Sequence, residues 1–233
     1  MTGRVSGLWV YPVKSMRGQA LDVADIETRG VVGDRLYAVR DEAGKFGSGK
    51  NTRRFARMDG LARWSARNVG ELVEVLPPDG DWLDAFGEAT TALLTAQVGR
   101  PVSIAREEAV SHFDAAPVHL LTTADLAQLR QFSGACPAAE TFRPNIVIES
   151  DARSGDWIGR RLTIGGVEFD VVAPTERCLM VNMTPEGGHG QDFLRVIAQR
   201  MEECFGVYAN VSQGGRVAIG GAVEAFQADI GSI

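Results

Sequence analysis

The chain has 233 residues, of which 45% are hydrophobic and 23% charged, a composition typical of a soluble globular protein. Its formal net charge of −6 argues against a nucleic-acid partner, because phosphate binding needs a clustered basic surface. Three widely spaced cysteines show neither a disulfide framework nor a zinc motif and favour a reducing compartment. Since no signal core and no stretch of ~20 apolar residues is found, we expect a cytoplasmic protein without a membrane partner.

The first half of the chain predicts mostly β-strands. Apolar residues alternate with polar ones between turn-forming glycines, prolines and acidic residues, as in half-buried strands. A helix over residues 85–98 is compatible with the sequence, because Gly99 and Pro101 would end it. We expect strands at residues 5–10, 21–28, 35–40, 61–69 and 71–76.

The second half adds two helices to further strands. Thr122 or Thr123 can cap a helix over residues 123–132, and apolar residues at helical spacing predict another over residues 192–204. Gly165-Gly166 predicts a hairpin turn between two of the strands. We expect strands at residues 118–122, 145–149, 161–164, 167–172, 207–211 and 222–226.

Together these elements predict a β-rich α+β fold. We expect two β-barrel-like lobes that pack together, with the two helices of the second half covering barrel openings. A glycine and a proline at positions 99 and 101 suggest a division into an amino-terminal domain, residues 1–99, and a carboxy-terminal domain, residues 100–233.

Two stretches of the first half offer basic groups to an anion. In residues 11–15 (YPVKS), Lys14 and Ser15 can present an ammonium and a hydroxyl to a phosphate at a turn. Arg35 follows a glycine turn, and residues 50–57 (KNTRRFAR) are basic within an acidic chain, so they could hold one small anionic ligand. An exposed loop lysine and a merely solvated basic loop are the alternatives.

Two stretches of the second half add a planar cation, an amide and a thiol. Arg143 and Asn145 flank a proline at the entry to an apolar strand and could make several hydrogen bonds to a heterocycle or a phosphate. A carboxylate partner for Arg143 is the alternative. Arg177 precedes Cys178, and a guanidinium beside a thiol favours the thiolate, which binds soft metals. The alternative is that Cys178 is a small buried hydrophobe.

The order of these motifs resembles that of the MOSC family. The family is named for the carboxy-terminal domain of molybdenum cofactor sulfurase, and it includes the mitochondrial amidoxime-reducing components. Here the domain is preceded by the family's amino-terminal β-barrel domain, and the resemblance runs from about Val5 to about Phe226. The motifs that carry it are residues 11–15 (YPVKS), 33–35 (GDR), 141–148 (TFRPNIVI) and 174–178 (PTERC).

The resemblance implies a molybdenum cofactor, molybdopterin carrying molybdenum, and no pyridoxal phosphate. It implies that the Cys178 thiolate is both the metal ligand and the catalytic residue. The other residues that it implies around the cofactor are Lys14, Ser15, Arg35, Thr52, Arg53, Arg143, Asn145 and Arg177. We expect Lys14, Arg35, Arg143 and Cys178 to converge on one cleft, with His189 near its entrance.

The resemblance also implies an oxidoreductase that reduces N-hydroxylated or N-oxidised small molecules. Three cysteines cannot build an iron–sulfur domain, so the electrons would come from a separate electron-transfer protein or reductase. One alternative is a sulfur carrier, or a carrier of the cofactor, that uses Cys178. Another is an inert domain that keeps the fold without the metal.

Overall fold

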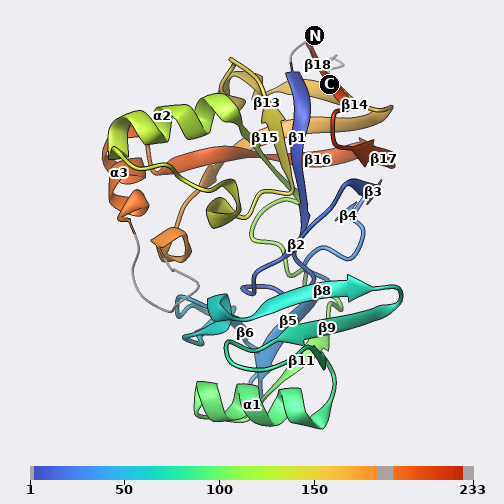
Figure 1. The fold of residues 1–233 in the computed structure, drawn as a ribbon, viewed down its shortest axis with the longest axis vertical. Coiled ribbons are helices and arrows are strands. Elements are labelled where there is room, and N and C mark those ends of the chain that lie inside the picture. Colours follow the sequence, from blue (N-terminus) through green and yellow to red (C-terminus); the bar gives the residue numbers. More distant parts are fainter. Residues whose placement is uncertain (1–2, 183–190, 228–233) are drawn as a thin grey trace.

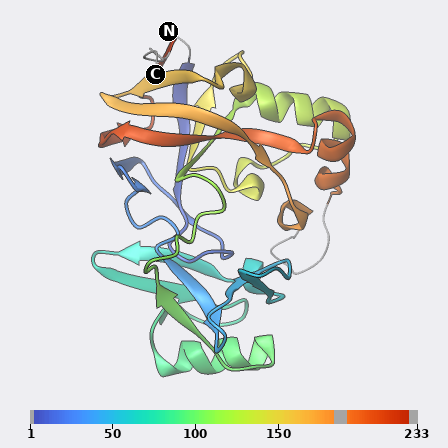
Figure 2. The same cartoon turned by 180° about the vertical axis from the view of Figure 1, so that it is seen from behind.

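The computed structural model describes residues 3–182 and 191–227, which form two β-rich lobes. Figure 1 shows one lobe above, which contains β1 (Gly3–Val10), and one below, which contains α1 (Glu88–Val98). The view from behind in Figure 2 shows the same division. The β-rich α+β fold that the sequence predicts is confirmed.

Seven strands of the described chain close into a barrel in the upper lobe. The strand β1 pairs with both β18 and β13, so the order of the sheet returns to its start. Around the barrel the strands are β13 (Ile146–Glu149), β12 (Val118–Thr122), β16 (Cys204–Gln213), β15 (Val167–Glu176), β14 (Arg160–Ile164), β18 (Ala222–Gln227) and β1. Alternate side chains point inward, and Leu8, Leu120 and Phe169 are among those that fill the barrel.

The hairpin predicted at Gly165-Gly166 joins β14 to β15. Ile164 and Val167 are paired across it, which leaves the two glycines as a two-residue turn. Their φ angles are +58° and +86°, values that glycine adopts without a steric penalty.

Two helices pack side by side on the outer wall of the barrel. The helix α2 (Thr123–Ser133) begins with a capping box between Thr122 and Asp125, and α3 (Phe193–Arg200) lies against it. Their apolar side chains meet Leu121 and Val147, which point away from the barrel interior because neighbouring strand residues alternate in direction. The prediction that these helices cover barrel openings is therefore wrong.

The lower lobe is built from short strands around a second apolar core. One sheet has the order β11 (Val102–Arg106), β5 (Tyr37–Asp41), β6 (Phe46–Ser48) and β7 (Phe55–Arg57), and a second has the order β10 (Leu83–Asp84), β9 (Leu72–Leu76) and β8 (Ser65–Val69). Leu94 of α1 and Trp64 are buried between them. Within the described residues no helix is long and apolar enough to cross a membrane.

Several predicted elements differ in length from the observed ones, and three of these differences have a local cause. The strand predicted at 61–69 begins as a 3-10 helix (Leu61–Arg63) and becomes β8 only at Ser65. The strand predicted at 35–40 starts at Tyr37, because Arg35 has a left-handed backbone with φ of +48°. The helix predicted at 192–204 ends at Arg200, since residues 202 and 203 also have positive φ and β16 then begins.

Strand pairing links the two halves of the chain. β1 belongs to the barrel of the second half, and β11 pairs with β5 of the first half. A further small sheet joins β17 (Gly215–Ala218) to β3 (Val23–Glu27) and β4 (Gly30–Val31). The short strand β2 (Gln19–Ala20) pairs antiparallel with the end of β1. The division into residues 1–99 and 100–233 stays a prediction.

Candidate active site

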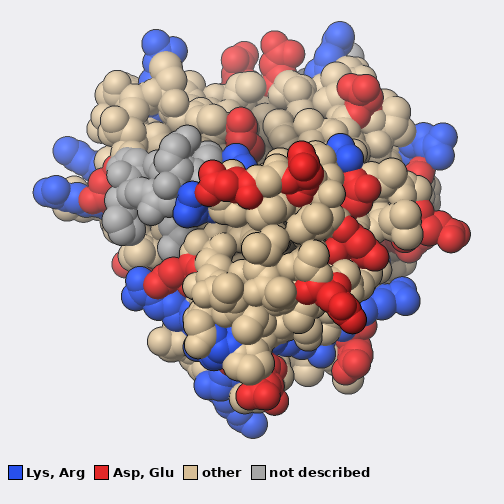
Figure 3. All heavy atoms as spheres, turned by 60° about the horizontal axis from the view of Figure 1, so that its bottom comes forward, with Lys and Arg blue, Asp and Glu red and all other residues tan. Residues whose placement is uncertain are grey.

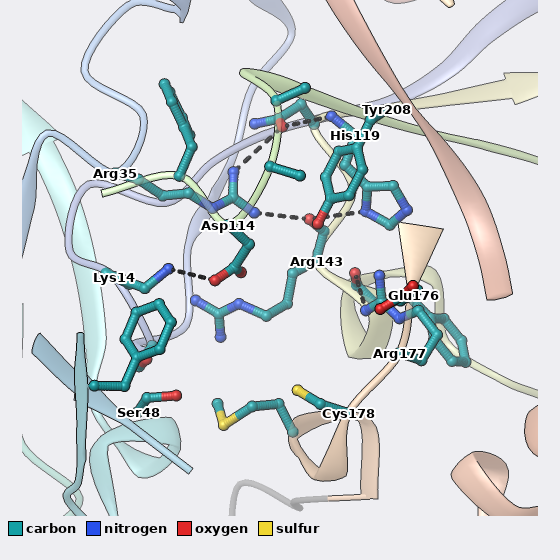
Figure 4. Close-up of a pocket in the computed structure, with 18 of the residues that line it drawn as sticks. Lys14, Arg35, Ser48, Asp114, His119, Arg143, Glu176, Arg177, Cys178 and Tyr208 are labelled. Carbon is teal, nitrogen blue, oxygen red and sulfur yellow. Dashed lines mark hydrogen bonds and ion pairs between the residues drawn. The ribbon is translucent and has the colours of Figure 1, made fainter. Parts of the chain in front are cut away.

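A pocket of about 550 Å³ lies between the two lobes. Lys14, Ser48 and Phe55 line it from the lower lobe and its connection, and Phe142 and Tyr208 line it from the barrel side. Figure 4 shows these walls facing one another across a shared space. Segments that are far apart in the sequence therefore contribute to one site.

Most of the predicted site residues line this pocket. The structure brings together the four expected to converge, as the sequence predicts, although their roles stay predictions. Of the nine predicted residues, those that line the pocket are Lys14, Ser15, Arg35, Arg143, Asn145, Arg177 and Cys178. Thr52 and Arg53 are exposed and are not among the lining residues; Ser48 and Lys50 of the same loop are. The contact of Thr52 and Arg53 with a cofactor stays a prediction.

Three of these residues have left-handed backbones. Their φ angles are +69° for Ser15, +48° for Arg35 and +57° for Arg143. A non-glycine residue in this region carries a steric penalty of ~1–2 kcal/mol. Hydrogen bonds hold two of them in place: Arg35 N donates to Tyr11 O at 2.7 Å and Arg143 N to Glu140 O at 3.0 Å. The fold therefore holds a strained geometry at the pocket wall.

Lys14 is buried in the pocket wall, where its ammonium forms an ion pair with Asp114. Its Nζ donates to the carbonyl oxygen of His112 at 2.7 Å and to Asp114 Oδ1 at 3.0 Å. Burial lowers the pKa of Lys14, and Asp114 opposes that shift. The Asp114 side chain is 59% exposed. Although burial raises the pKa of this carboxyl, the ammonium of Lys14 outweighs burial and holds the pKa below its usual value.

Arg35 and Asn145 form the framework behind the pocket. The guanidinium of Arg35 pairs with buried Asp34 and donates to Asn145 Oδ1 at 3.2 Å and to the Arg143 carbonyl oxygen at 3.1 Å. Burial disfavours its charge, but Asp34 outweighs burial and raises the pKa of Arg35. Asn145 is fully buried, and its Oδ1 also accepts from His119 N at 3.1 Å. Both side chains are therefore largely occupied by protein partners.

Arg143 and Arg177 supply charge that the described chain does not neutralise. Arg143 donates to the carbonyl oxygen of Met16, and its guanidinium carbon lies 4.9 Å from the centre of the Tyr11 ring. Burial, and then the charge of Arg35, lower its pKa to about 10. Arg177 donates to the Phe142 carbonyl oxygen at 2.8 Å, its buried Nε has no hydrogen-bond partner in the described part of the chain, and burial lowers its pKa. Neither arginine forms an ion pair with a described carboxylate, so the alternative of a carboxylate partner for Arg143 finds no support there.

Cys178 lies just after the end of β15 and is exposed. The alternative that it is a small buried hydrophobe is therefore wrong. Its sulfur faces the open space below Arg143, on the opposite side of the pocket from Lys14 (Figure 4). The residues described contain no group of three histidine, cysteine or acidic side chains placed to hold a metal ion by themselves.

The side chains that line the pocket suit a ligand with an anionic group at one end and, at the other end, a metal that a thiolate can bind. Five basic side chains and two carboxylates are among the described residues that line the pocket, which leaves an excess of positive charge. The buried Nε of Arg177 without a partner is a further place for an acceptor. A phosphate suits the arginines, and a thiolate suits a soft or high-valent metal. The residues present therefore fit molybdopterin carrying molybdenum.

Sequence reasoning missed several lining residues. Asp114 lies in the connection between β11 and β12, where the sequence shows no catalytic motif. His119 is buried on β12, and burial followed by the charge of Arg177 lowers its pKa well below the usual value. Tyr208 projects from β16. Because tertiary pairing alone brings them to the pocket, spacing could not have found them. His189 lies outside the described residues.

Comparison with known proteins identifies the family. The family "MOSC domain" matches residues 107–224, and the family "MOSC N-terminal beta barrel domain" matches residues 2–117. The chain belongs to the MOSC family, as the motif order predicts.

Two curated relatives are similar over most of the chain. The mitochondrial amidoxime reducing component 2 of Bos taurus and the mitochondrial amidoxime-reducing component 1 of Homo sapiens are each 25% identical over 228 residues, which is 80% of this chain and 68% of the relative. Among solved structures, the YUAD protein from Bacillus subtilis covers 97% of this chain and 96% of its own, with a TM-score of 0.54 and 13% identity. That likeness concerns the fold alone.

Proposed function

We propose that this protein binds a molybdenum cofactor and reduces N-hydroxylated or N-oxidised small molecules with electrons from a separate donor. The observation that carries the proposal is the pocket itself, which joins an exposed thiol to two arginines without a described carboxylate partner. Similarity to the amidoxime-reducing components, whose names state the reaction class, supports it. A cytoplasmic location stays a prediction.

Different pocket residues would hold different parts of the cofactor. Lys14 and Arg143 would face its phosphate, with Ser15 at the same wall, and Arg177 would donate to an acceptor nearer the thiol. The Cys178 thiolate would be the protein ligand to the metal. When bound, the cofactor would supply the two-electron couple for this reduction. Arg35 and Asn145 would hold Arg143 in place rather than touch the ligand, since Arg35 donates both to Asn145 and to the Arg143 carbonyl oxygen.

Reduction of an amidoxime also needs protons. The N–O bond breaks, two electrons and two protons are taken up, and the oxygen leaves as water. The Lys14–Asp114 pair is suited to pass a proton, because burial lowers the pKa of the Lys14 ammonium and the 59% exposed Asp114 carboxylate is hydrogen-bonded to that ammonium at 3.0 Å. The ammonium would give up the proton, and Asp114 would help to replace it from solvent.

The test measures amidine formed from an amidoxime by the holoprotein, with a chemically reduced viologen dye as donor. We expect turnover in the wild type, a loss of at least about tenfold in kcat for Asp114→Asn, and partial recovery for Asp114→Glu. Unchanged turnover in Asp114→Asn would contradict the proton role. No turnover in a wild-type protein that holds stoichiometric molybdenum would contradict the proposed function.

Exposure of Cys178 also favours one other function, a sulfur carrier with a persulfide on this residue. Sulfur released by cyanide from freshly purified protein without molybdenum would support that function. An absence of both signals would support an inert domain.

A further inference from the structure

A loop at the edge of the pocket carries a concentration of positive charge. The segment Lys45 to Arg57 contains five basic residues and no acidic residue, in a chain with a net charge of −6. The cofactor pocket takes up only part of this segment, since Lys50 lines it and Arg53 does not. Figure 3 shows that basic side chains gather along the lower left of one face, whereas acidic ones are most frequent on its right half. The segment Lys45 to Arg57 is therefore an exception within an acidic chain.

The loop is joined to the pocket by one aromatic side chain. Strands β6 and β7 pair in parallel, Phe46 with Phe55, and hold the intervening loop at the mouth. The ammonium groups of Lys14 and Lys50 lie 5.2 and 5.3 Å from the centre of the Phe55 ring. Lys14 is buried and Lys50 is exposed. The two lysines on the Phe55 ring thus place positive charge both at the pocket wall and at the neighbouring surface.

Four of the five basic side chains have no carboxylate partner among the described residues. We call Lys45, Lys50, Arg53 and Arg54 the basic rim. Lys45 donates to the Thr52 carbonyl oxygen at 3.3 Å, and Arg54 donates to the carbonyl oxygen of Phe113 at 2.9 Å. Carbonyl partners orient these cations but leave their charge in place. The fifth residue, Arg57, is paired with Asp59.

We propose that the basic rim is the docking surface for an acidic one-electron carrier protein. The inference rests on the proposed function, because that function needs electrons that the chain cannot supply. Two reduced carriers would dock in turn and each give up one electron, two protons would enter from solvent, and the N–O oxygen would leave as water. A surface next to the pocket mouth shortens the path for each electron. Complementary charge would raise the rate of encounter rather than the strength of the final complex.

The rim fits a small acidic protein better than a nucleic acid. Four cations give few phosphate contacts, and the net charge of −6 repels a long polyanion. An acidic carrier needs only a local match of charge and leaves again after each transfer. Fast release suits a transient redox encounter.

The test compares two electron donors on the holoprotein with an amidoxime as substrate. One donor is an acidic 2Fe–2S ferredoxin, and the other is a reduced viologen dye. The variant is Lys45→Glu, since Lys45 does not line the pocket, and the matched control is Arg160→Glu, because Arg160 is exposed on β14 in the upper lobe. We expect the variant to reduce ferredoxin-driven turnover at least about tenfold at low ionic strength. The difference should fade near 1 M salt, where the Debye length is ~3 Å.

The outcomes distinguish a failure of the docking proposal from a failure of the proposed function. Unchanged dye-driven turnover with slowed ferredoxin-driven turnover supports the docking surface. Equal loss with both donors would overturn it. Unchanged turnover with ferredoxin, an equal loss in Arg160→Glu, or tight binding of single-stranded DNA that only Lys45→Glu abolishes would also overturn it. An absence of dye-driven turnover in the wild type would instead contradict the proposed function.

Discussion

Replacement of Arg143 by methionine should stabilise the protein that lacks cofactor while removing its response to phosphate. The guanidinium is mostly buried beside Arg35 without a described carboxylate, and its pKa is lowered to about 10. Because the unfolded chain binds the proton more tightly, the charge destabilises the folded state below pH 10. This destabilisation disappears only as the pH rises above about 10 towards the ordinary pKa of arginine.

The size of the effect follows from two opposing contributions. A pKa lowered to about 10 from the ordinary value of arginine corresponds to about 3 kcal/mol at neutral pH. Methionine would leave the Met16 carbonyl oxygen without its donor, which costs about 1 kcal/mol. We therefore expect Arg143→Met to raise the free energy of unfolding by about 2 kcal/mol, or the melting temperature by roughly 4–8 °C.

Urea and thermal unfolding of protein expressed without cofactor biosynthesis would measure this change. Inorganic phosphate at about 100 times its dissociation constant should stabilise the wild type by ~2.7 kcal/mol and the variant by much less. Arg130→Met is the matched control, because Arg130 is exposed on α2 and should change stability by under about 0.5 kcal/mol. A variant less stable than the wild type, or a wild type that phosphate leaves unchanged, would refute the reasoning.

Two further predictions concern residues that support the pocket from behind: His112, whose carbonyl oxygen accepts from Lys14, and Gly206, which lies against His119. Burial lowers the pKa of His112 to about 4, so the unfolded chain binds the proton more tightly and stability should fall as the pH drops from 6.5 towards 4. Urea unfolding across this window should show a weaker dependence in His112→Asn, and an unchanged dependence would contradict the assignment. Gly206→Ala should destabilise by about 2–4 kcal/mol, because φ is +84° and a Cβ would run into His119 and lie 2.8 Å from the Leu120 carbonyl oxygen. Gly220→Ala, with φ of +82° and open space, should lose only ~1 kcal/mol, and equal losses in the two variants would contradict the steric argument.

Local patterns predicted the elements where local forces decide them. A short, mostly apolar run predicted β12 at its observed bounds, since a strand that is buried on both faces has a continuous apolar run rather than an alternating pattern. Thr122 identified the start of α2 because a side-chain cap is a local interaction. Strand pairing between distant segments, such as β17 with β3, depends on tertiary packing and left no comparable mark.

The candidate site was also predicted where its residues lie together in the sequence and missed where only the fold brings them together. Arg177 and Cys178 were found because they lie together in one motif. The left-handed backbones of Arg35 and Arg143 were not predicted, since arginine rarely adopts that conformation and only the surrounding hydrogen bonds impose it. Asp114 was missed for a similar reason, because its link to Lys14 spans a hundred residues.

Molybdenum and pterin content, measured on freshly purified wild type and on Cys178→Ser, tests the central proposal most directly. Protein from a host that lacks cofactor biosynthesis is the control. We predict stoichiometric molybdenum and molybdopterin in the wild type. In Cys178→Ser we predict a loss of most molybdenum with pterin partly retained, because the basic side chains would still hold the phosphate. Wild type without either component from a competent host, or a variant that keeps its molybdenum in full, would contradict the account.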